Sequence, residues 1–253
     1  MSIRTVNTNG VAVIEIARPE KKNALTQAMY TAMTEAILAA DADATIRALL
    51  ITGQPGIFTS GNDLEDFMQR PPQGEDSPVF QFMKALAECG KPVVAAVTGG
   101  AIGIGTTMLL HCDLVYVSDE ARLAMPFVTL GLVPEYASSL LIPQRVGNAK
   151  ATELLLLGEP FNGQSAVEMG IANAVLPAAE VVNHARRMAE RFNALPPGAV
   201  RESKALMRRG QQALVKETIA VEAGVFGKRL RSPEAMEAFQ AFFQKRKPDF
   251  SKF

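Results

Sequence analysis

The sequence contains few of the residues that bind metals or form disulfides. Among its 253 residues there are two histidines, His111 and His184, and two cysteines, Cys89 and Cys112. So small a supply argues against a zinc site, a serine–histidine pair and a disulfide framework. We interpret both histidines as structural. Because both cysteines lie in or beside apolar segments, we expect buried, reduced thiols and a cytoplasmic protein.

Net charge and long apolar runs are also missing. The 26 basic and 26 acidic side chains balance to a formal net charge of zero, which leaves no electrostatic footprint for nucleic acid or an anionic membrane. No apolar run approaches the length of a membrane span, and residues 1–10 lack the pattern of a signal peptide. We therefore expect neither nucleic acid nor membrane as a partner. The ending Ser251-Lys252-Phe253 departs from the peroxisomal S-K-L signal at its last residue, and we interpret the similarity as coincidence.

What the chain does contain is typical of an α/β protein with a large core. Hydrophobic residues make up 48% of the sequence and charged residues 21%, an ordinary globular composition. Short β-branched runs alternate with segments whose apolar residues recur at helical spacing, and after residue 149 almost every segment is helical by pattern. We predict an α/β core over residues 1–195 and a helical C-terminal region over residues 196–253.

The pattern predicts the following elements. Strands are expected at Val11–Ala17, Arg47–Thr52, Pro92–Val97, Asp113–Val117, Arg122–Ala124 and Ala172–Leu176. Helices are expected at Thr26–Ala40, Val79–Glu88, Met108–Cys112, Tyr136–Val146, Ala149–Leu157, Gln164–Met169, Ala178–Asn193, Ala199–Arg209, Leu214–Lys228 and Pro233–Arg246. Pro134 suits the first position of a helix, so Glu135 is expected in the first helical turn, with a break at Pro143. Residues 69–77 are expected to form a surface loop, and Arg201 and Lys204 to lie at the surface.

The strand and glycine loop at Pro92–Thr107 is the most informative stretch. An apolar strand breaks into four glycines within seven positions before an apolar run resumes. Glycine lets the main chain approach a ligand closely, and a first helical turn presents unpaired N–H groups, so negative charge is expected to bind or develop here. The order G-G-A-I-G-I-G matches neither the dinucleotide fingerprint nor the phosphate loop that ends in G-K-[ST]. Taken alone, the stretch is explained equally well by a tight strand-to-helix turn.

Three stretches together resemble the crotonase (enoyl-CoA hydratase/isomerase) superfamily: Phe58–Leu64, Lys91–Gly105 and Cys112–Asp113. The similarity extends to the tail Phe243–Phe250. It implies a spiral of strand-strand-helix turns with a helical C-terminal trimerisation region, assembled as a homotrimer or a dimer of trimers. It also implies an acyl-CoA thioester substrate and no cofactor, since coenzyme A is part of the substrate and the chemistry needs neither a metal nor a redox group.

In that family two backbone N–H groups bind the thioester oxygen, and the resemblance assigns them to Asn62 and Ile104. Removing a proton from the carbon next to a thioester places negative charge on that oxygen, and preorganised donors stabilise the resulting enolate. Asp63 is expected to hold the loop by hydrogen bonds rather than to react. Lys22 and Lys245 are candidates for contacts with CoA phosphates, although charge runs are usually solvated. The substrate-binding candidates are Ser60, Gly61, Asp63, Leu64, Gly103, Phe127, Lys22 and Lys245.

Departures from the family pattern bear on the reaction. Family hydratases carry two glutamates, which align here with Thr107 and Phe127, and neither residue can transfer a proton as a carboxylate does. The stretch Leu130–Ser139 is similar to the segment that bears the single catalytic glutamate of peroxisomal-type Δ3,Δ2-enoyl-CoA isomerases, which falls on Glu135. Such a base removes a proton from C2 of a 3-enoyl-CoA and returns it at C4.

Glu135 has a simpler explanation when the resemblance is set aside. A glutamate at a helix start is favoured by the helix dipole alone. For turnover its pKa has to be raised by an apolar pocket, for which Phe127, Leu132 and Tyr136 are candidate walls. We therefore expect a Δ3,Δ2-enoyl-CoA isomerase. The alternatives are an enoyl-CoA hydratase or another crotonase-type lyase, and a non-catalytic acyl-CoA-binding scaffold.

Overall fold

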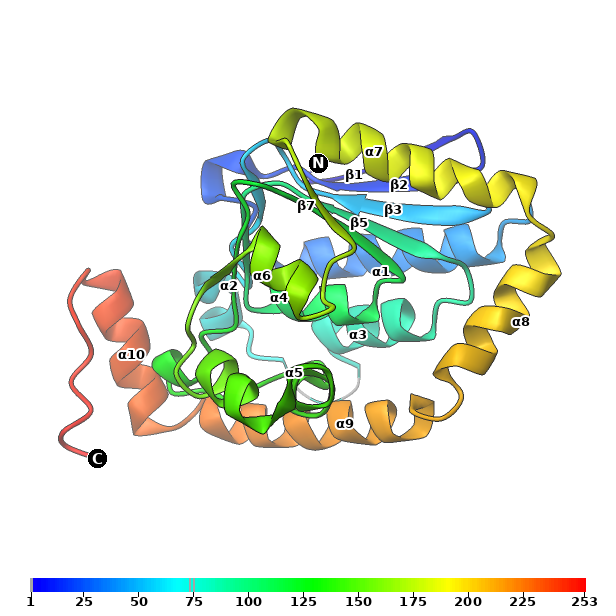
Figure 1. Cartoon of the computed structure of the whole chain (residues 1–253). Helices are drawn as coiled ribbons and strands as arrows, with labels where there is room; N and C mark the ends of the chain where they lie inside the picture. The colour runs from blue at the N-terminus through cyan, green and yellow to red at the C-terminus, as the bar shows by residue number, and fades with distance from the viewer. Residues whose placement is uncertain (1, 73, 75) are drawn as a thin grey trace.

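The computed structural model describes residues 2–72, 74 and 76–253 (Figure 1). The surface loop expected over residues 69–77 includes Gln73 and Glu75, which lie outside the described residues. The strands are β1 (Ile3–Thr8), β2 (Val11–Ile16), β3 (Ala48–Thr52), β4 (Ile57–Thr59), β5 (Val93–Val97), β6 (Gly100–Ile102), β7 (Leu114–Ser118), β8 (Arg122–Ala124), β9 (Phe161–Asn162) and β10 (Ala174–Leu176). The helices are α1 (Gln27–Ala42), α2 (Leu64–Gln69), α3 (Pro78–Glu88), α4 (Ile104–Thr107), α5 (Ser138–Leu155), α6 (Gly163–Glu168), α7 (Ala178–Glu190), α8 (Pro197–Arg208), α9 (Gln212–Arg229) and α10 (Pro233–Phe243). Short 3-10 turns are η1 (Pro19–Lys21), η2 (Met108–His111), η3 (Val128–Leu130) and η4 (Arg191–Ala194).

The larger sheet has the strand order β1-β2-β3-β5-β7-β10. Only β1 and β2 pair antiparallel; the other pairs are parallel. Every residue of β3 and β5 is buried, as expected for parallel strands covered on both faces. Val13, Leu50 and Val94 stand in register on one face and pack against α7, while α1 and α3 cover the opposite face (Figure 1).

The smaller sheet has the order β4-β6-β8-β9. In each of the pairs β3/β4, β5/β6 and β7/β8, the first strand belongs to the larger sheet and the second to the smaller one. This repetition is the strand-strand-helix spiral that the resemblance implies, so the predicted α/β class is confirmed. Because β4, β6 and β8 run parallel, the segments that follow them leave the sheet at one edge.

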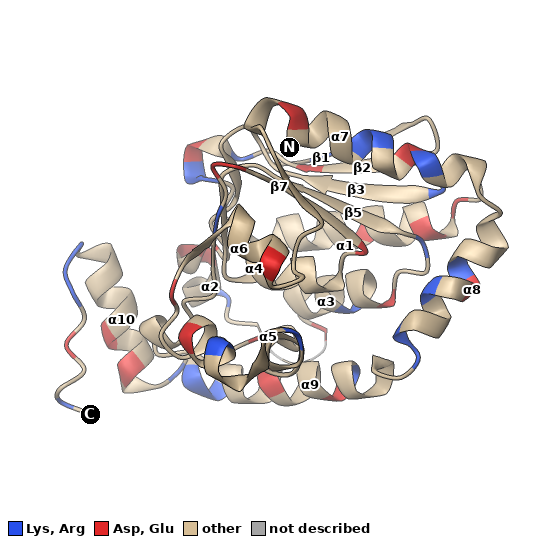
Figure 2. Cartoon of the chain, viewed as in Figure 1, with Lys and Arg blue, Asp and Glu red and all other residues tan. Residues whose placement is uncertain are grey.

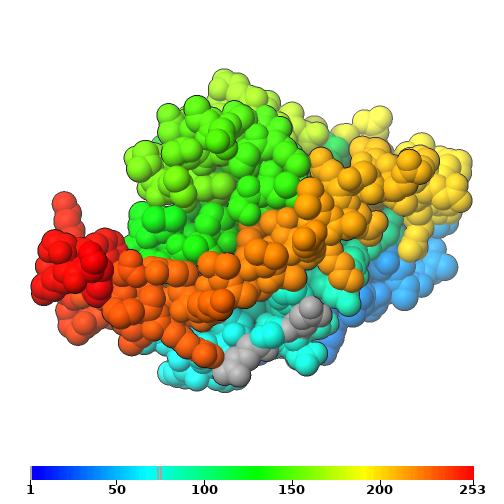
Figure 3. Space-filling model, turned by 90° about the horizontal axis from the view of Figure 1, so that it is seen from below, coloured from blue at the N-terminus to red at the C-terminus, as the bar shows by residue number. Residues whose placement is uncertain are grey.

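The three C-terminal helices extend away from the two sheets. In Figure 1, α8 descends along one side, α9 passes beneath α5, and α10 projects beyond the sheets. From below, α9 crosses the underside of the molecule (Figure 3). Figure 2 shows both acidic and basic residues along α7, whereas the charged residues of α8 are mainly basic. None of the helices in the described ranges is both long enough and apolar enough to cross a membrane.

The expected helix start at Pro134 is wrong. Helix α5 begins at Ser138, because Tyr136 and Ala137 adopt left-handed conformations with φ of 60° and 57°. Glu135 therefore lies before the helix rather than in its first turn, so the helix dipole does not explain its presence. The expected break at Pro143 is wrong as well, since the helical path is interrupted at Gly147 (φ 75°, ψ 166°).

The expectation that Lys204 lies at the surface is also wrong. Its side chain is 8% exposed, and Nζ donates to Asp113 Oδ2 and to the Lys91 carbonyl oxygen, both at 2.6 Å. Arg208 donates to the other Asp113 oxygen at 2.8 Å, and the Val93 N–H donates to Asp113 at 2.7 Å. Asp113 thus joins α8 to the beginnings of β5 and β7, a long-range arrangement that local polarity does not reveal.

Candidate active site

Two backbone turns lie side by side where β4 and β6 end. Thr59 of β4 pairs with Ala101 of β6 in parallel, so both turns emerge at the same edge. A Cβ on Gly61 (φ 92°) would stand 2.9 Å from the Ile102 carbonyl oxygen, and one on Gly105 would stand 2.6 Å from Thr59 Cγ2. Only glycine at these two positions lets the two turns approach so closely.

Within the described part of the chain, these turns carry two main-chain donors that have no partner. Around the first, the Leu25 N–H donates to the Gly61 oxygen at 2.8 Å and the Asp63 N–H donates to the Leu25 oxygen at 2.9 Å. The N–H of Asn62 between them has no partner among the described residues. Ile104 is the first residue of α4, so its N–H has no partner within the helix. The residues assigned to the thioester oxygen are thus both free to donate.

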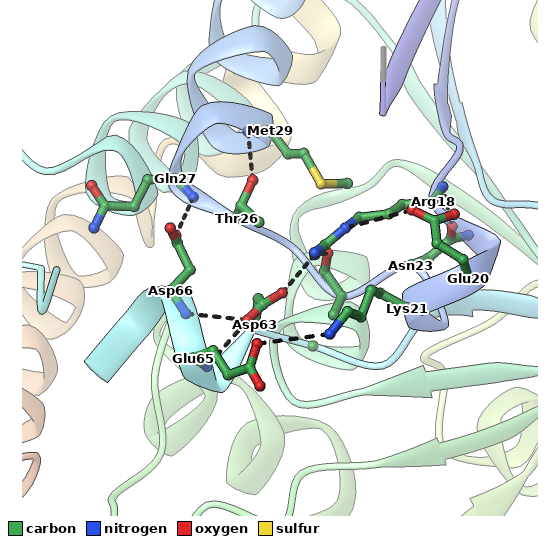
Figure 4. A network of polar contacts seen from close by, with 12 residues as sticks. Arg18, Glu20, Lys21, Asn23, Thr26, Gln27, Met29, Asp63, Glu65 and Asp66 are labelled. Atoms are coloured by element: carbon green, nitrogen blue, oxygen red, sulfur yellow. Dashed lines mark hydrogen bonds and ion pairs between the residues drawn. The ribbon is translucent and has the colours of Figure 1, made fainter. Parts of the chain in front are cut away.

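Asp63 holds the first turn in place (Figure 4). It caps α2 by accepting from the N–H groups of Glu65 and Asp66, each at 3.1 Å, and pairs with Arg18 at 2.6 Å. The Arg18 guanidinium also donates to the Ala24 oxygen at 2.9 Å. Burial opposes ionisation of Asp63, but the hydrogen bonds from Arg18 and Asp66 outweigh it and lower the pKa. The carboxylate is therefore ionised and already engaged.

Glu135 has the opposite environment. The residue is 5% exposed, and Oε1 has no hydrogen-bond partner within the described ranges. Burial, followed by the charge of Glu222, raises the pKa of Glu135 to about 8. Its carbonyl oxygen accepts from Ser138 Oγ at 2.6 Å and from the Ser138 N–H at 3.1 Å. The main chain of Glu135 is thus fixed, but one of its carboxyl oxygens has no partner. Burying an unpaired polar atom costs free energy, so such an atom points to a role in binding or catalysis.

Tyr30 connects the Glu135 region to the first turn. Its hydroxyl donates to Asn62 Oδ1. Burial and then the nearby charge of Glu135 raise the pKa of Tyr30 well above its usual value. The Tyr30 ring also packs on Phe82 at 5.4 Å, and Phe82 lies 6.4 Å from the Tyr136 ring. Sequence analysis did not identify Tyr30; the only signal was a hydroxyl on the apolar face of a helix.

Thr107 and Phe127 complete this part of the molecule. Both are buried, and Thr107 Oγ1 has no partner among the described residues. A Cβ on Gly103 would lie 3.7 Å from the Phe127 ring, which places that ring beside the second turn. Neither side chain is a carboxylate. The three candidate pocket walls, Phe127, Leu132 and Tyr136, are all buried.

A family profile described as enoyl-CoA hydratase/isomerase matches residues 6–252, nearly the entire chain. The chain belongs to the enoyl-CoA hydratase/isomerase family. Family membership places this chain among proteins named for enoyl-CoA chemistry. It supports a crotonase-type enzyme and is consistent with an acyl-CoA substrate.

Individual members of the enoyl-CoA hydratase/isomerase family differ in the reaction they are named for. A Bacillus subtilis protein named "probable enoyl-CoA hydratase" is 30% identical over 95% of both chains. Human enoyl-CoA delta isomerase 2 is 33% identical over 94% of this chain, which spans 62% of that protein's length. The solved structure of Pseudomonas aeruginosa OdaA superposes with a TM-score of 0.94 at 54% identity, over 95% of this chain and 98% of that one.

The remaining substrate-binding candidates lie in different places. Lys22 is exposed beside the first turn, where its carbonyl oxygen accepts from the Ser60 N–H at 3.1 Å. Leu64 begins α2, next to the Asp63 cap. Lys245 is exposed after α10 in the C-terminal region. Neither lysine forms an ion pair with any described residue, so both ammonium groups are free to bind an anion.

One buried carboxylate near Glu135 was missed by sequence analysis. Glu222 of α9 is 6% exposed and accepts hydrogen bonds from the segment that follows Glu135. It is 85 residues along the chain from its partner Ala137, and its neighbour on α9, Val221, is exposed. No local signal distinguishes it from a surface glutamate.

Proposed function

We propose that this chain is a Δ3,Δ2-enoyl-CoA isomerase that moves a double bond along an unsaturated fatty acyl-CoA. The observation that carries the proposal is the buried Glu135 carboxyl, with one unpaired oxygen and a pKa raised to about 8 by burial and then by Glu222. A general base works best when its pKa is near the working pH. The positions that align with the hydratase glutamates, Thr107 and Phe127, provide no carboxylate.

In this mechanism ionised Glu135 takes a proton from C2 of a 3-enoyl-CoA. The electron pair of the broken C–H bond moves toward the thioester oxygen and forms a dienolate. The N–H groups of Asn62 and Ile104 donate to that oxygen as it gains charge. Protonated Glu135 then returns the proton at C4, the double bond forms between C2 and C3, and the carboxylate is regenerated. No other reactant is consumed.

The surroundings of the two turns support this division of roles. Asp63 is ionised and occupied by Arg18 and by the start of α2, so it is poorly placed to act as a second base. Tyr30 bonds to the Asn62 side chain and so restrains the residue whose N–H donates. The donors are therefore held before substrate binds, which is the condition under which such donors contribute most.

Turnover of 3-hexenoyl-CoA tests the proposal. The wild type is expected to convert it to the conjugated 2-enoyl thioester, and Glu135→Gln is expected to lower kcat by about 10²- to 10⁴-fold, the usual contribution of a general base. Glu168→Gln is a matched control, because Glu168 is exposed on α6 and bonds only to Gln164. Equal rates in Glu135→Gln and the wild type would refute the role of Glu135.

The same assay separates the alternatives. Hydration of crotonyl-CoA at rates well above isomerisation would favour a hydratase, the reaction for which the Bacillus subtilis relative is named. Tight binding of CoA esters without turnover at any chain length would favour an acyl-CoA-binding scaffold. Either result overturns the isomerase proposal and leaves the family assignment intact.

We further propose that the chain assembles as a homotrimer or a dimer of trimers through its C-terminal helices. Val221 on α9 is 60% exposed, and Met236 and Phe242 on α10 are 52% and 59% exposed. Large apolar side chains that are exposed on these two helices favour an interface there. Lys245 follows these residues, so a neighbouring subunit's Lys245 is a candidate for the CoA phosphates. Light scattering measures the subunit number directly.

A further inference from the structure

The turn that follows Glu135 is held from two directions. Glu222 Oε2 accepts from the Ala137 N–H at 2.5 Å, and Glu222 Oε1 accepts from the Ser139 N–H at 2.9 Å and from Ser139 Oγ at 2.5 Å. From another side, His111 Nε2 donates to the Tyr136 carbonyl oxygen at 2.8 Å, with the two rings stacked 3.8 Å apart. Glu222 of α9 and His111 of η2 thus both bond to the segment from Tyr136 to Ser139.

That segment has a conformation that its residue types disfavour. Tyr136 and Ala137 both have φ near +60°, and a residue with a Cβ pays about 1–2 kcal/mol for each such conformation. Strained positions persist only where the surrounding contacts over-determine them. The Ala137 N–H, at the centre of this strain, bonds to Glu222, so the Glu222 carboxylate is the contact that most directly stabilises the left-handed turn.

We propose that Glu222 is a positioning residue for Glu135: its carboxylate holds the left-handed turn at Tyr136 and Ala137, and this turn buries the Glu135 carboxyl beside Tyr30. This inference rests on the proposed role of Glu135 in proton transfer. It assigns a function to α9, a helix of the C-terminal region, in a site otherwise built from the preceding α/β part of the chain.

The hydrogen bonds around Glu222 match an ionised carboxylate. All three of its partners donate, two through main-chain N–H groups and one through the Ser139 hydroxyl. A proton on Oε2 would face the Ala137 N–H, which can only donate, whereas a proton on Oε1 could be accepted only by the Ser139 hydroxyl. The pKa of Glu222 is raised, because burial outweighs the bonds from Ser139 and Ala137, which act in the opposite direction.

The ionised carboxylate also acts on Glu135 through space. After burial, Glu222 is the group that raises the pKa of Glu135. The other titratable groups coupled to Glu135 are the phenols of Tyr30, on α1, and Tyr136, and both stay neutral because burial raises their pKa values further. Glu222 is therefore the charged group that affects Glu135 in the described part of the chain, and removing its charge changes the basicity of Glu135 in a known direction.

Glu222→Gln tests this inference. It is expected to lower kcat for 3-hexenoyl-CoA about tenfold or more with KM nearly unchanged, since the thioester donors are untouched. The midpoint of the kcat profile is expected to move down by about one pH unit, because a like charge next to Glu135 has been removed. Ser139→Ala is the matched control: it removes one hydrogen bond to Glu222, keeps the charge, and is expected to leave the midpoint in place.

A readout independent of turnover keeps the two proposals separate. Carboxyl ¹³C NMR of glutamate-labelled protein, with the Glu135 signal identified by its loss in Glu135→Gln, reports the titration of Glu135 directly. The titration midpoint of Glu135 is expected to fall in Glu222→Gln whether or not Glu135→Gln is active. Full activity of Glu135→Gln would overturn only the proposed function. An unchanged midpoint in Glu222→Gln, with kcat within twofold of wild type, overturns the positioning role.

If Glu222→Gln does not fold, Glu222→Asp decides the matter. The shorter side chain keeps the charge but withdraws the carboxylate from the Ala137 N–H. A kcat about tenfold lower than wild type at similar KM is expected, and a kcat within twofold of wild type would overturn the proposal.

Discussion

A Cβ on Gly105 would stand 2.6 Å from Cγ2 of Thr59. Gly105 belongs to the turn that carries Ile104, and Thr59 ends the strand that leads to Asn62. The distance between the two N–H donors therefore depends on the absence of a side chain at residue 105. The same relationship recurs between Gly61 and the Ile102 oxygen, at 2.9 Å. The geometry of the proposed oxyanion site is therefore set by two close glycine approaches.

Gly105→Ala is expected to lower kcat by about 10²-fold or more. The added methyl has to push α4 away from β4, which displaces the Ile104 donor, and loss of one such donor in acyl-transfer enzymes costs roughly 2.7–4 kcal/mol. Steady-state kinetics with 3-hexenoyl-CoA measures the effect. Gly198→Ala is the control, because a Cβ there meets nothing within 4 Å. If both variants kept wild-type rates, the spacing of the turns would not matter for turnover.

The pH dependence of the wild type follows from the pKa of Glu135, which burial and then Glu222 raise to about 8. The base is active when ionised, and the ionised fraction grows as pH rises toward the pKa. We expect kcat for isomerisation to increase about tenfold per pH unit below 8 and to level off above it. A profile that is flat between pH 6 and pH 9 would contradict the pKa or the role of the residue.

Ionisation of Glu135 also changes the free energy of unfolding in a predictable direction. The pKa of Glu135 is raised from an ordinary 4.5, taken for the unfolded chain, to about 8 in the folded protein. Its contribution to the free energy of unfolding is therefore complete below pH 4.5 and is lost as the pH rises through the folded-state pKa of about 8. A tenfold change in a protonation equilibrium corresponds to about 1.4 kcal/mol. Glu135→Gln, which never ionises, is expected to be more stable than wild type at pH 8 by a few kcal/mol.

Urea denaturation of the two proteins at pH 4.5 and pH 8 measures this difference. The advantage of Glu135→Gln is expected to shrink at the lower pH, where wild-type Glu135 is protonated as well. A constant gap at both pH values would show that the substitution acts through packing rather than through ionisation.

Arg18→Met is expected to destabilise the protein by about 1–3 kcal/mol and to lower kcat. The Arg18 and Asp63 side chains are 17% and 10% exposed, so removing the guanidinium leaves a poorly solvated carboxylate next to the first turn. Arg4→Met is the control, because the Arg4–Glu15 pair is largely exposed and such pairs contribute little. Equal denaturation midpoints for the two variants would contradict the structural role of Arg18.

Asp113→Ala is expected to cost about 3–5 kcal/mol, because it leaves the buried Lys204 ammonium without its carboxylate. Arg208 and the Val93 N–H lose the same partner. Chemical denaturation gives the value, with Lys150→Met at an exposed pair as the control. A loss below about 1 kcal/mol would indicate that α8 is held by other contacts.

Much of the α/β core follows from patterns that span only a few residues. Runs of β-branched and apolar residues predict β3, β5 and β7, and helical spacing of apolar residues predicts α1 and α7, because each pattern reflects burial of one element against the sheet. The positions of Asn62, Ile104 and Glu135 came from resemblance, and their assigned roles stay predictions. The class of fold and the family were confirmed.

Tertiary contacts decided the rest. The start of α5 at Ser138, rather than near Pro134, depends on a carboxylate 85 residues away that holds Ala137 in a left-handed conformation. Lys204 is buried because its ammonium group donates to the Asp113 carboxylate, and the Tyr30 hydroxyl of α1 donates to the side chain of Asn62, which follows β4. Local pattern records how each segment meets its neighbours in the chain. It does not record which distant polar group completes a strained turn or neutralises a buried charge, since those partners come together only when the whole chain has folded.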